Sequence, residues 1–388
     1  MTILLHILDI LLFVIIAVNI LYLTFFSIAS LLRFKERAPL TATPKRIAIL
    51  IPAYKEDKVI RECVKSCLKQ NYSPTDYDVV VISDRMSDTT NLALEKLPIK
   101  LIRVSFENST KAKALNYAFS QLDDIYDLAL ILDADNIIQH DFLSQLSSLF
   151  AYSDIKIVQA HRCAKNINTP PAMLDAISEE INNSIFRRGH ARVGLSAALI
   201  GSGMCFNYKL LKQTMLMVDA VGGFDRALEL LLLRNGTRVF YLPYSDVLDE
   251  KIQHHSDFSN QRRRWLSAQL HYLSTTIKYV PAAIAERKWD FCDKMFQQMS
   301  IPRIMLLGFC FIFSIIVTFI DFSMSIKWWS IFAILIITLA IAVPRKLYTK
   351  QLFGAIVQLP YFFILMALNI FKLKGANKKF IHTKHGVE

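Results

Sequence analysis

Two glycine-rich signatures are missing from this chain of 388 residues. Neither G-x-G-x-x-G nor G-x-x-x-x-G-K-[ST] occurs, so the phosphate cradles of dinucleotide-binding and P-loop proteins are excluded. The six cysteines also lack the paired spacing that is typical of zinc sites. Cys63 and Cys67 are one helical turn apart, and we interpret them as buried thiols in a reducing compartment.

Charged residues are scarce as well, at 20% of the chain against 53% hydrophobic residues. This balance is too apolar for an ordinary cytosolic enzyme, and the apolar residues gather at the two ends. Residues 10–32 carry no charge and are long enough to cross a bilayer. That segment is too long for a cleaved signal peptide, and no basic residue precedes it. Three further apolar segments cover residues 304–320, 328–343 and 351–371.

Lysine and arginine flank these segments and predict how the chain sits in a membrane. Five basic residues between positions 33 and 46 place the amino terminus outside and the following block in the cytoplasm. Basic residues lie on both sides of residues 351–371, so we expect an interfacial helix there, bent at Pro360. The prediction is three spans and one interfacial helix, with four spans as the alternative. The formal charge of +12 then fits anchoring on anionic lipid, and nucleic acid is not an expected partner.

The block between the apolar ends has the pattern of an α/β domain. Its expected strands are residues 46–51, 78–82, 100–104, 128–132 and 155–159, separated by helical patterns. This alternation predicts βαβ units and a mostly parallel sheet. Polar residues follow three of the strands: Tyr54 and Glu56, then Asp84, then Asp133 and Asp135. Because the carboxyl ends of parallel strands share one edge, we expect these side chains to meet in one crevice.

Asp133 and Asp135 are separated by a single residue. Two carboxylates at this spacing suit a divalent cation held against a diphosphate, since Mg²⁺ takes hard oxygen ligands. Taken alone, the pair is more simply interpreted as a polar turn after a strand.

Five further motifs accompany this pair in a regular order. They are Pro52-Ala-Tyr-Lys-Glu56, Asp84 with Asp88, Lys111-Ala-Lys-Ala-Leu-Asn116, Gly201-Ser-Gly-Met204 and Gln261-Arg-Arg-Arg-Trp265. With these motifs the chain resembles the membrane-bound family 2 glycosyltransferases, which include cellulose, chitin and hyaluronan synthases and glucosylceramide synthase. The resemblance covers the whole central block and the layout of the carboxyl-terminal segments. It implies an α/β, GT-A-like (Rossmann-like) domain with transmembrane helices at both ends.

The resemblance also implies which residues hold the donor, usually a uridine nucleotide. The residues on this side are Pro52, Tyr54, Glu56, Asp84, Lys113 and Asp133, with Asp135 as the ligand of Mg²⁺ or Mn²⁺. Lys111 is the alternative to Lys113, and both begin a helix whose dipole favours phosphate. From the residues alone, Tyr54 is also consistent with a boundary aromatic and Asp84 with a helix N-cap.

Inversion at a sugar carbon needs a base that takes the proton of the acceptor hydroxyl. Members of the family normally carry a Glu-Asp pair after Gly-Gly-Phe, and this chain lacks the pair. The position implied for the base is Asp225. Glu229 is the alternative, but it is more simply interpreted as an ordinary helical residue. On the acceptor side the resemblance implies Gly201, Ser202, Gly203, Met204, Gln261, Arg264 and Trp265, with Cys205 beside Met204. Thr383 and Lys384 loosely resemble a gating segment that closes over the nucleotide.

The functional prediction is a membrane-bound inverting glycosyltransferase that moves a sugar from a nucleoside diphosphate sugar, expected to be a UDP-sugar, to a lipid or glycan hydroxyl. It would be integral to the plasma (inner) membrane with its catalytic domain in the cytoplasm. The expected units are residues 1–33, 44–265, 266–303, 304–343 and 344–388, in turn a span, the catalytic domain, interfacial helices, two spans, and an interfacial helix with a basic tail. A processive polysaccharide synthase and a non-catalytic nucleotide-sugar-binding protein are the alternatives.

Overall fold

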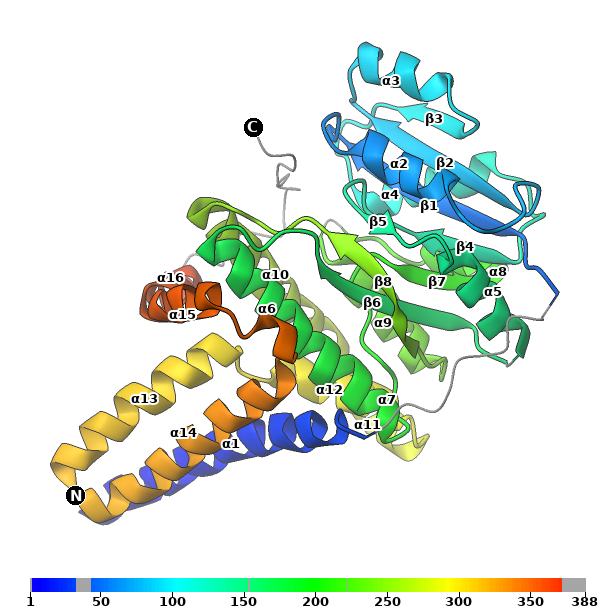
Figure 1. The fold of residues 1–388 in the computed structure, drawn as a ribbon. Helices are drawn as coiled ribbons and strands as arrows, with labels where there is room; N and C mark the ends of the chain where they lie inside the picture. The colour runs from blue at the N-terminus through cyan, green and yellow to red at the C-terminus, as the bar shows by residue number, and fades with distance from the viewer. Residues whose placement is uncertain (1, 33–42, 153, 221, 372–388) are drawn as a thin grey trace.

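The computed structural model describes residues 2–32, 43–152, 154–220 and 222–371. Its domain is built on an eight-stranded sheet with the order β3-β2-β1-β4-β7-β6-β8-β5 (Figure 1). The strands are β1 (Ile47–Tyr54), β2 (Tyr77–Asp84), β3 (Lys100–Val104), β4 (Leu128–Ile131), β5 (Ile137–Ile138), β6 (Ile157–Ala164), β7 (Met204–Asn207) and β8 (Phe240–Asp249). Arg33, Lys35 and Arg37, and the tail with Thr383 and Lys384, lie outside the described residues.

Helices connect and cover the strands. Those around the sheet are α2 (Ile60–Leu68), α3 (Asp88–Glu95), α4 (Lys111–Gln121), α5 (Phe142–Tyr152), α8 (Tyr208–Met215) and α9 (Phe224–Arg234). Those beside it are α6 (Pro170–Asn182), the π-helix η1 (Asn183–Gly189), α7 (His190–Arg192), α10 (His255–Thr276), η2 (Ile277–Tyr279), α11 (Val280–Ala285) and α12 (Trp289–Met299). The remaining helices are α1 (Thr2–Ala29), α13 (Arg303–Ile320), α14 (Phe322–Ala342), η3 (Arg345–Leu347), α15 (Lys350–Val357) and α16 (Leu359–Phe371).

The middle of the sheet is apolar on both faces. β1, β2 and β4 are almost entirely buried and pair in parallel, as uninterrupted aliphatic runs predict. One face packs on α2 and α5, and the other on α4, α8 and α9. Four of the seven strand pairings are parallel, so the sheet is mixed but mostly parallel.

Three strands, β5, β7 and β8, lie outside the five that the sequence predicts, and β7 also changes the place of a predicted site residue. β7, which begins at Met204, runs antiparallel between β4 and β6, whereas the motif analysis places Met204 in an acceptor loop. Its side chain and that of Cys205 are fully buried in the two cores of the sheet. The strand is only four residues long, too short to show an alternating pattern.

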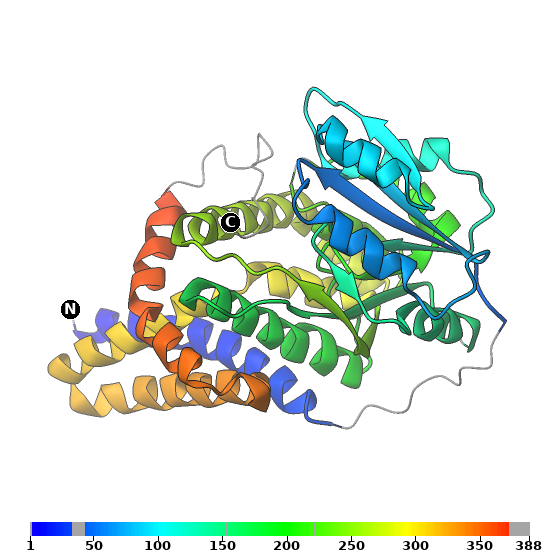
Figure 2. The same ribbon diagram turned by 45° about the horizontal axis from the view of Figure 1, so that its top comes forward.

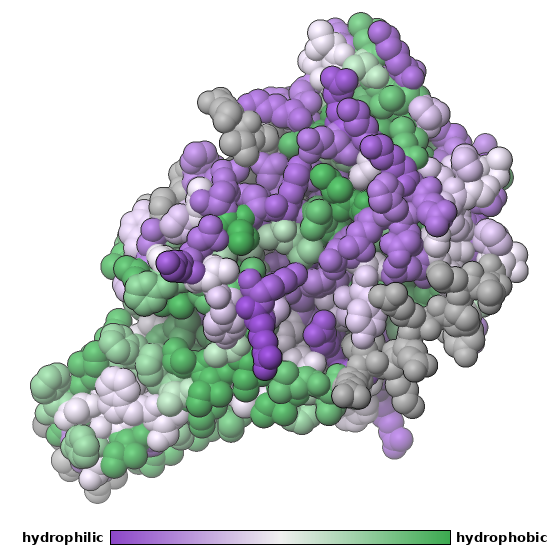
Figure 3. All heavy atoms as spheres, viewed as in Figure 1, coloured by the Kyte–Doolittle hydropathy of each residue, from purple (hydrophilic) through white to green (hydrophobic). Residues whose placement is uncertain are grey.

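Three helices form an apolar arm that projects from the side of the domain where α6 and α10 lie (Figures 1 and 2). The segments Leu4–Ala29, Arg303–Ile320 and Phe322–Ala342 are long and apolar enough to cross a membrane. Figure 3 shows apolar side chains over this arm and polar ones over much of the sheet domain. The three helices pack around the buried Trp328, whose indole nitrogen donates to Asp9 at 2.8 Å.

The last apolar segment is broken, as the sequence predicts. α15 and α16 meet at an angle of 45°, next to Pro360 in the first turn of α16. A proline in a first turn loses no helical hydrogen bond, so it marks the start of a new helix. The pair adds a fourth candidate span only if its two helices count as one.

The arm is docked to the domain by a close helix crossing. A side-chain carbon at Gly189 of η1 would lie 2.2 Å from the carbonyl oxygen of Phe26 in α1, so only glycine permits this approach. The imidazole of His190 stacks on the ring of Phe26 with centroids 3.6 Å apart. The crossing holds α1 against the segment that continues α6.

A buried ion-pair cluster ties the last strands to α6. His161 of β6 contacts Asp246 of β8 through Nδ1 at 2.7 Å and Glu180 of α6 through Nε2 at 3.1 Å. Lys346 of η3 lies 3.9 Å from the other oxygen of Glu180. Ligand atoms of Cys163, His161 and Asp246 lie within 4.8 Å of one another. Since both ring nitrogens already contact carboxylates, the cluster is a carboxylate–imidazolium–carboxylate bridge.

Raising the pH is expected to destabilise the fold through this bridge. Burial lowers the pKa of His161, but the hydrogen bonds to Asp246 and Glu180 outweigh burial and raise the pKa to about 9. Because the folded-state pKa lies above the ordinary 6.5, the stabilisation is complete below pH 6.5 and is lost as the pH rises through about 9. The loss amounts to about 3 kcal/mol.

Thermal unfolding in detergent from about pH 6 to about pH 10 measures this loss. His161→Gln should flatten the decline in Tm, whereas His271→Gln, on the exposed side of α10, should retain it. The same slope in both variants would show that the bridge does not titrate in this range.

Candidate active site

A cavity of about 600 Å³ lies where the carboxyl ends of β1, β2 and β4 face α10 and α12. It brings together most of the residues that the sequence analysis selects. The predicted site residues that line it are Pro52, Tyr54, Glu56, Asp84, Asp133, Asp135, Gly201, Asp225, Gln261, Arg264 and Trp265. Four others do not line it: Lys113, Ser202, Gly203 and Met204.

The sheet register places the first two strand ends side by side. Tyr54 is paired with Asp84 across β1 and β2. Both following residues, Lys55 and Arg85, have φ near +55°, a left-handed conformation that costs a non-glycine residue about 1 kcal/mol or more. Oδ1 of Asp84 is buried and has no hydrogen-bond partner among the described residues. An unsatisfied buried acceptor in a cavity wall fits a ligand that carries an N–H or O–H donor.

Three carboxylates meet at the ends of β4 and β8. Ligand oxygens of Asp133, Asp135 and Asp249 lie within 4.8 Å of one another. Asn136 donates to Asp135 at 3.3 Å and to Asp249 at 3.2 Å, and the amide of Glu250 donates to Asp135 at 3.0 Å. These contacts fix the orientation of the carboxylates. A set of hard oxygen ligands fits Mg²⁺ or Mn²⁺.

Asp249 is a site residue that the sequence analysis does not select. The feature that could have indicated Asp249 is its position at the end of a strand. However, β8 alternates buried and more exposed residues, so it lacks the continuous apolar run that marks β1, β2 and β4, and it carries no family motif. Nearby cations hold the carboxylates in place. Arg162 lies 3.6 Å from Asp249 and 3.9 Å from Asp133, and Lys251 donates to Asp249 at 2.8 Å. Burial lowers the pKa of Arg162, but Asp249 and Glu179 outweigh it, so the pKa stays high and the guanidinium charged.

Of the two lysines at the start of α4, only Lys111 reaches the cavity. Its Nζ pairs with Asp133 and donates to the carbonyl of Gly201 at 2.6 Å. Lys113 instead points along the loop and donates to the carbonyl of Asn108 at 3.1 Å. The expectation that Lys113 belongs to the site is therefore corrected: Lys111, the alternative, is the lysine that lines the cavity. The two positions differ by about 200° around a helix, so only one of them can face the sheet edge.

Asp225 and Glu229 occupy opposite environments on α9. A side-chain carbon at Gly201 would lie 3.6 Å from Oδ2 of Asp225, which places this carboxylate at the cavity wall. It makes no hydrogen bond or ion pair within the part of the chain that the structure describes. Glu229 is buried away from the cavity and pairs with Lys294 at 2.7 Å. Of the two candidates, only Asp225 is accessible to a substrate.

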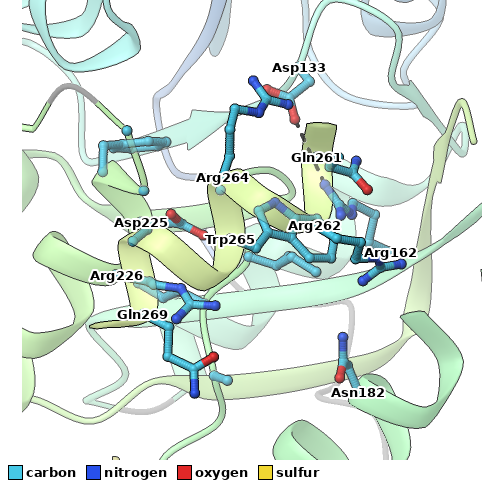
Figure 4. A pocket seen from close by; sticks show the side chains of 18 of the residues that line it. Asp133, Arg162, Asn182, Asp225, Arg226, Gln261, Arg262, Arg264, Trp265 and Gln269 are labelled. Atoms are coloured by element: carbon cyan, nitrogen blue, oxygen red, sulfur yellow. Dashed lines mark ion pairs between the residues drawn. The ribbon is translucent and has the colours of Figure 1, made fainter. Parts of the chain in front are cut away.

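The opposite wall of the cavity comes from α10. Gln261, Arg264 and Trp265 project from this helix, and Figure 4 shows Trp265 between Arg162 and Asp225. Arg262 covers Trp265 with its guanidinium 4.4 Å from the ring centroid, and pairs with Asp175 at 2.6 Å. α10 continues to Thr276, so Trp265 lies in the middle of a helix and not at the predicted unit boundary.

The residues that follow Gly201 in its motif pack beneath the cavity wall and do not line the cavity. The hydroxyl of Ser202 accepts a hydrogen bond from the amide of Asp133 at 3.2 Å. Gly203, with φ of +61°, packs on Val247, and Gln159 donates to its carbonyl at 3.3 Å. Ser202, Gly203 and Met204 therefore hold β4 and β7 in position. They do not line the cavity, so the expectation that they contact an acceptor is corrected.

Known proteins resemble this chain over its sheet domain and, in one solved structure, over most of its length. The family described as "Glycosyltransferase like family 2" matches residues 44–268, more than half of the chain. Poly(ribitol-phosphate) beta-N-acetylglucosaminyltransferase TarS of Staphylococcus aureus is 24% identical over 145 residues, which cover 35% of this chain and 24% of TarS. Dolichyl N-acetyl-alpha-D-glucosaminyl phosphate 3-beta-D-2,3-diacetamido-2,3-dideoxy-beta-D-glucuronosyltransferase of Methanococcus voltae is 22% identical over 214 residues, which cover 51% of this chain and 64% of that relative. Both matches therefore span less than two thirds of the relatives' own length.

Among solved structures, mannosyltransferase PcManGT from Pyrobaculum calidifontis, in complex with GDP-Man and Mn²⁺, superposes with a TM-score of 0.55. The superposition covers 91% of this chain and 92% of PcManGT at 15% identity, and confirms the GT-A-like sheet fold. From the family match, the fold and the enzyme names of its relatives, the chain belongs to glycosyltransferase family 2 and is a glycosyltransferase.

Proposed function

We propose that the protein is a membrane-bound, metal-dependent inverting transferase that moves a sugar from a UDP-sugar to the hydroxyl of a lipid or glycan acceptor. The observation that carries this proposal is the convergence of Asp84, Asp133, Asp135 and Asp225 on one cavity. These residues come from three distant segments of the chain: the end of β2, the turn after β4 and the start of α9.

On the donor side, Asp84 would accept a hydrogen bond from the N–H of the base, since its Oδ1 has no partner among the described residues. Tyr54 and Glu56 would hold the nucleoside, and Lys111 would contact the diphosphate. The cation would be held by Asp135 with Asp133 and Asp249, and it would neutralise the charge that develops on the leaving diphosphate. The complex of PcManGT with GDP-Man and Mn²⁺ supports a nucleoside diphosphate sugar and a metal in this fold.

On the acceptor side, Trp265 would form the platform for the acceptor, with Gln261 and Arg264 beside it. Asp225 would take the proton of the attacking hydroxyl, because its carboxylate faces the cavity without a partner in the described chain. A carboxylate whose acceptor lone pairs are free can receive a proton without first breaking an ion pair.

The arm supports a place in the membrane. Three helices of sufficient length and apolarity lie at both ends of the chain, and the basic residues beside them favour the plasma (inner) membrane with the domain in the cytoplasm. Three spans are few for a translocation tunnel in one chain, which favours transfer of one or a few sugars over a processive synthase.

Turnover of nucleotide sugars tests the proposal. The purified full chain in detergent should release UDP from at least one UDP-sugar in the presence of Mg²⁺ or Mn²⁺ and should stop releasing it in EDTA. GDP-sugars are tested in parallel. Turnover of a GDP-sugar but of no UDP-sugar would keep the transferase assignment and reject the assignment of uridine as the base. UDP binding without turnover of any sugar would instead support the non-catalytic alternative.

A further inference from the structure

The cavity has two chemically different ends. At the sheet edge it is lined by the acidic residues that would hold the donor. At the other end it reaches apolar side chains of two arm helices and of the last helix: Leu23 of α1, Ile304 of α13 and Met366 of α16. A single cavity thus extends from the catalytic carboxylates to the helices that are candidate membrane spans.

Two guanidiniums at this apolar end of the cavity have no acidic partner among the residues that the structure describes. Arg226 donates to Oε1 of Gln298 at 2.9 Å, and Arg303 donates to Oδ1 of Asn182 at 2.7 Å and to Ser178. Both arginines line the cavity and are half-buried. Among the described residues, no carboxylate lies within 4 Å of either one, although most buried cations of this protein have such a partner.

The basic groups next to them are already matched. Arg262 pairs with Asp175 at 2.6 Å, Arg187 with Glu179 at 3.1 Å and Lys294 with Glu229 at 2.7 Å. Arg262 and Arg303 also share one acceptor, because both donate to Oγ of Ser178, at 3.5 Å and 3.2 Å. These three carboxylates are therefore in use, and Arg226 and Arg303 remain without an ion pair among the described residues.

A desolvated guanidinium without an ion-pair partner is unfavourable, and burial lowers the pKa of Arg226 by more than the attraction of Asp225 and Glu229 raises it. An anion that accepts several N–H donors would satisfy both arginines, and a phosphate matches the planar fork of a guanidinium. We propose that Arg226 and Arg303 bind the phosphate of an anionic lipid acceptor whose hydrocarbon chain leaves the cavity between α1, α13 and α16. This inference rests on the proposed function and names the acceptor class of the same site.

The phosphate subsite is connected to the catalytic groups by short links. Arg226 follows Asp225 directly in α9. Gln269 lies one turn after Trp265 on α10, and it donates to the carbonyls of Gln298 and Ser300 at 2.9 Å and 3.1 Å. This contact holds the segment that leads from α12 into Arg303. A headgroup phosphate bound here would leave a headgroup hydroxyl within the same cavity as Trp265 and Asp225.

The transfer step is then balanced. The bond between the anomeric carbon and the donor phosphate oxygen breaks, and its electron pair leaves with the nucleoside diphosphate. The headgroup hydroxyl forms the new bond to the anomeric carbon, and its proton moves to the carboxylate of Asp225. Arg226 and Arg303 take no part in bond making and act only on binding and position of the acceptor.

Binding of simple alkyl phosphates tests the subsite on the full chain in neutral detergent micelles. The probes are dodecyl phosphate, dodecanol as its neutral match, and inorganic phosphate, and the readouts are the Kd of each probe and, separately, the Kd of UDP with Mn²⁺. Arg226→Gln and Arg303→Gln should each weaken dodecyl phosphate binding by about tenfold to a hundredfold, as expected for a charged hydrogen bond. Arg263→Gln, on the same helix as Trp265 but outside the cavity lining, is the matched control and should bind like the wild type.

Unchanged UDP binding in the two variants would show that they fold and that the effect is confined to the acceptor end. If dodecanol binds as tightly as dodecyl phosphate, or if the variants retain wild-type affinity, the phosphate subsite is refuted. Inorganic phosphate binding as tight as dodecyl phosphate refutes the lipid part, and loss of UDP binding in either variant assigns the arginines to the donor instead. If the wild type binds dodecyl phosphate through both arginines but turns over no nucleotide sugar, the proposed function fails while this inference stands.

Discussion

Asp135→Ala is expected to abolish metal-dependent release of the nucleoside diphosphate. The substitution removes one of three clustered carboxylates and one hydrogen-bond acceptor each of Asn136 and the amide of Glu250. Loss of several kcal/mol of charge stabilisation corresponds to a fall in kcat of about 10²-fold to 10³-fold, and the remaining release should no longer depend on the metal. The measurement is UDP release from the sugar donor over a range of Mn²⁺ concentrations.

Asp127→Ala is the matched control for this experiment. Asp127 precedes the same strand, β4, but lies at its amino end, where its carboxylate accepts from the amide of Arg46 at 2.9 Å. The control should keep wild-type activity and the same dependence on Mn²⁺. Full activity in Asp135→Ala would remove this residue from the metal site.

Asp225→Asn is expected to stop transfer while leaving the donor bound. Asparagine keeps the shape of the side chain but cannot accept a proton, and a general base contributes about 10²-fold to 10⁴-fold to the rate. The Kd of UDP with Mn²⁺ should remain that of the wild type, because Asp225 comes from α9 and not from the strand ends that would hold the nucleotide and the metal. Separate measurement of donor binding and transfer makes this distinction.

Glu229→Gln distinguishes the two acidic residues of α9. Glu229 forms a buried pair with Lys294, so its neutralisation leaves a buried cation and costs about 3 kcal/mol or more. The expected phenotype is a lower Tm, with activity retained at temperatures where the variant is folded. If Glu229→Gln is stable and inactive while Asp225→Asn is active, the assignment of the base is reversed.

The sheet domain and the apolar arm follow closely from the sequence because their signals are local. Buried parallel strands are continuous aliphatic runs, and the runs at β1, β2, β3 and β4 predict those strands within a few residues. Length and apolarity likewise predict α1, α13 and α14 as candidate spans. The break before α16 is visible as Pro360.

The candidate site is only partly predictable because several of its contacts depend on long-range pairing. Asp249 enters the acidic cluster through the pairing of β8 with β6, which no local pattern around residue 249 indicates. The choice between Lys111 and Lys113 is also not a local one, because it depends on which side of α4 faces the sheet. Arg226 and Arg303 are separated by 77 positions in the chain and share a cavity only because α12 packs on α9.

Binding of Mn²⁺ in the presence of UDP, followed by electron paramagnetic resonance, tests the central claim that one acidic cavity holds a metal and a nucleotide together. With the wild type, addition of UDP should convert free Mn²⁺ to the protein-bound form, and Asp135→Ala should abolish the conversion. If Mn²⁺ remains free with the wild type, or binds equally to Asp135→Ala, then the carboxylates at the ends of β4 and β8 are not a metal-nucleotide site.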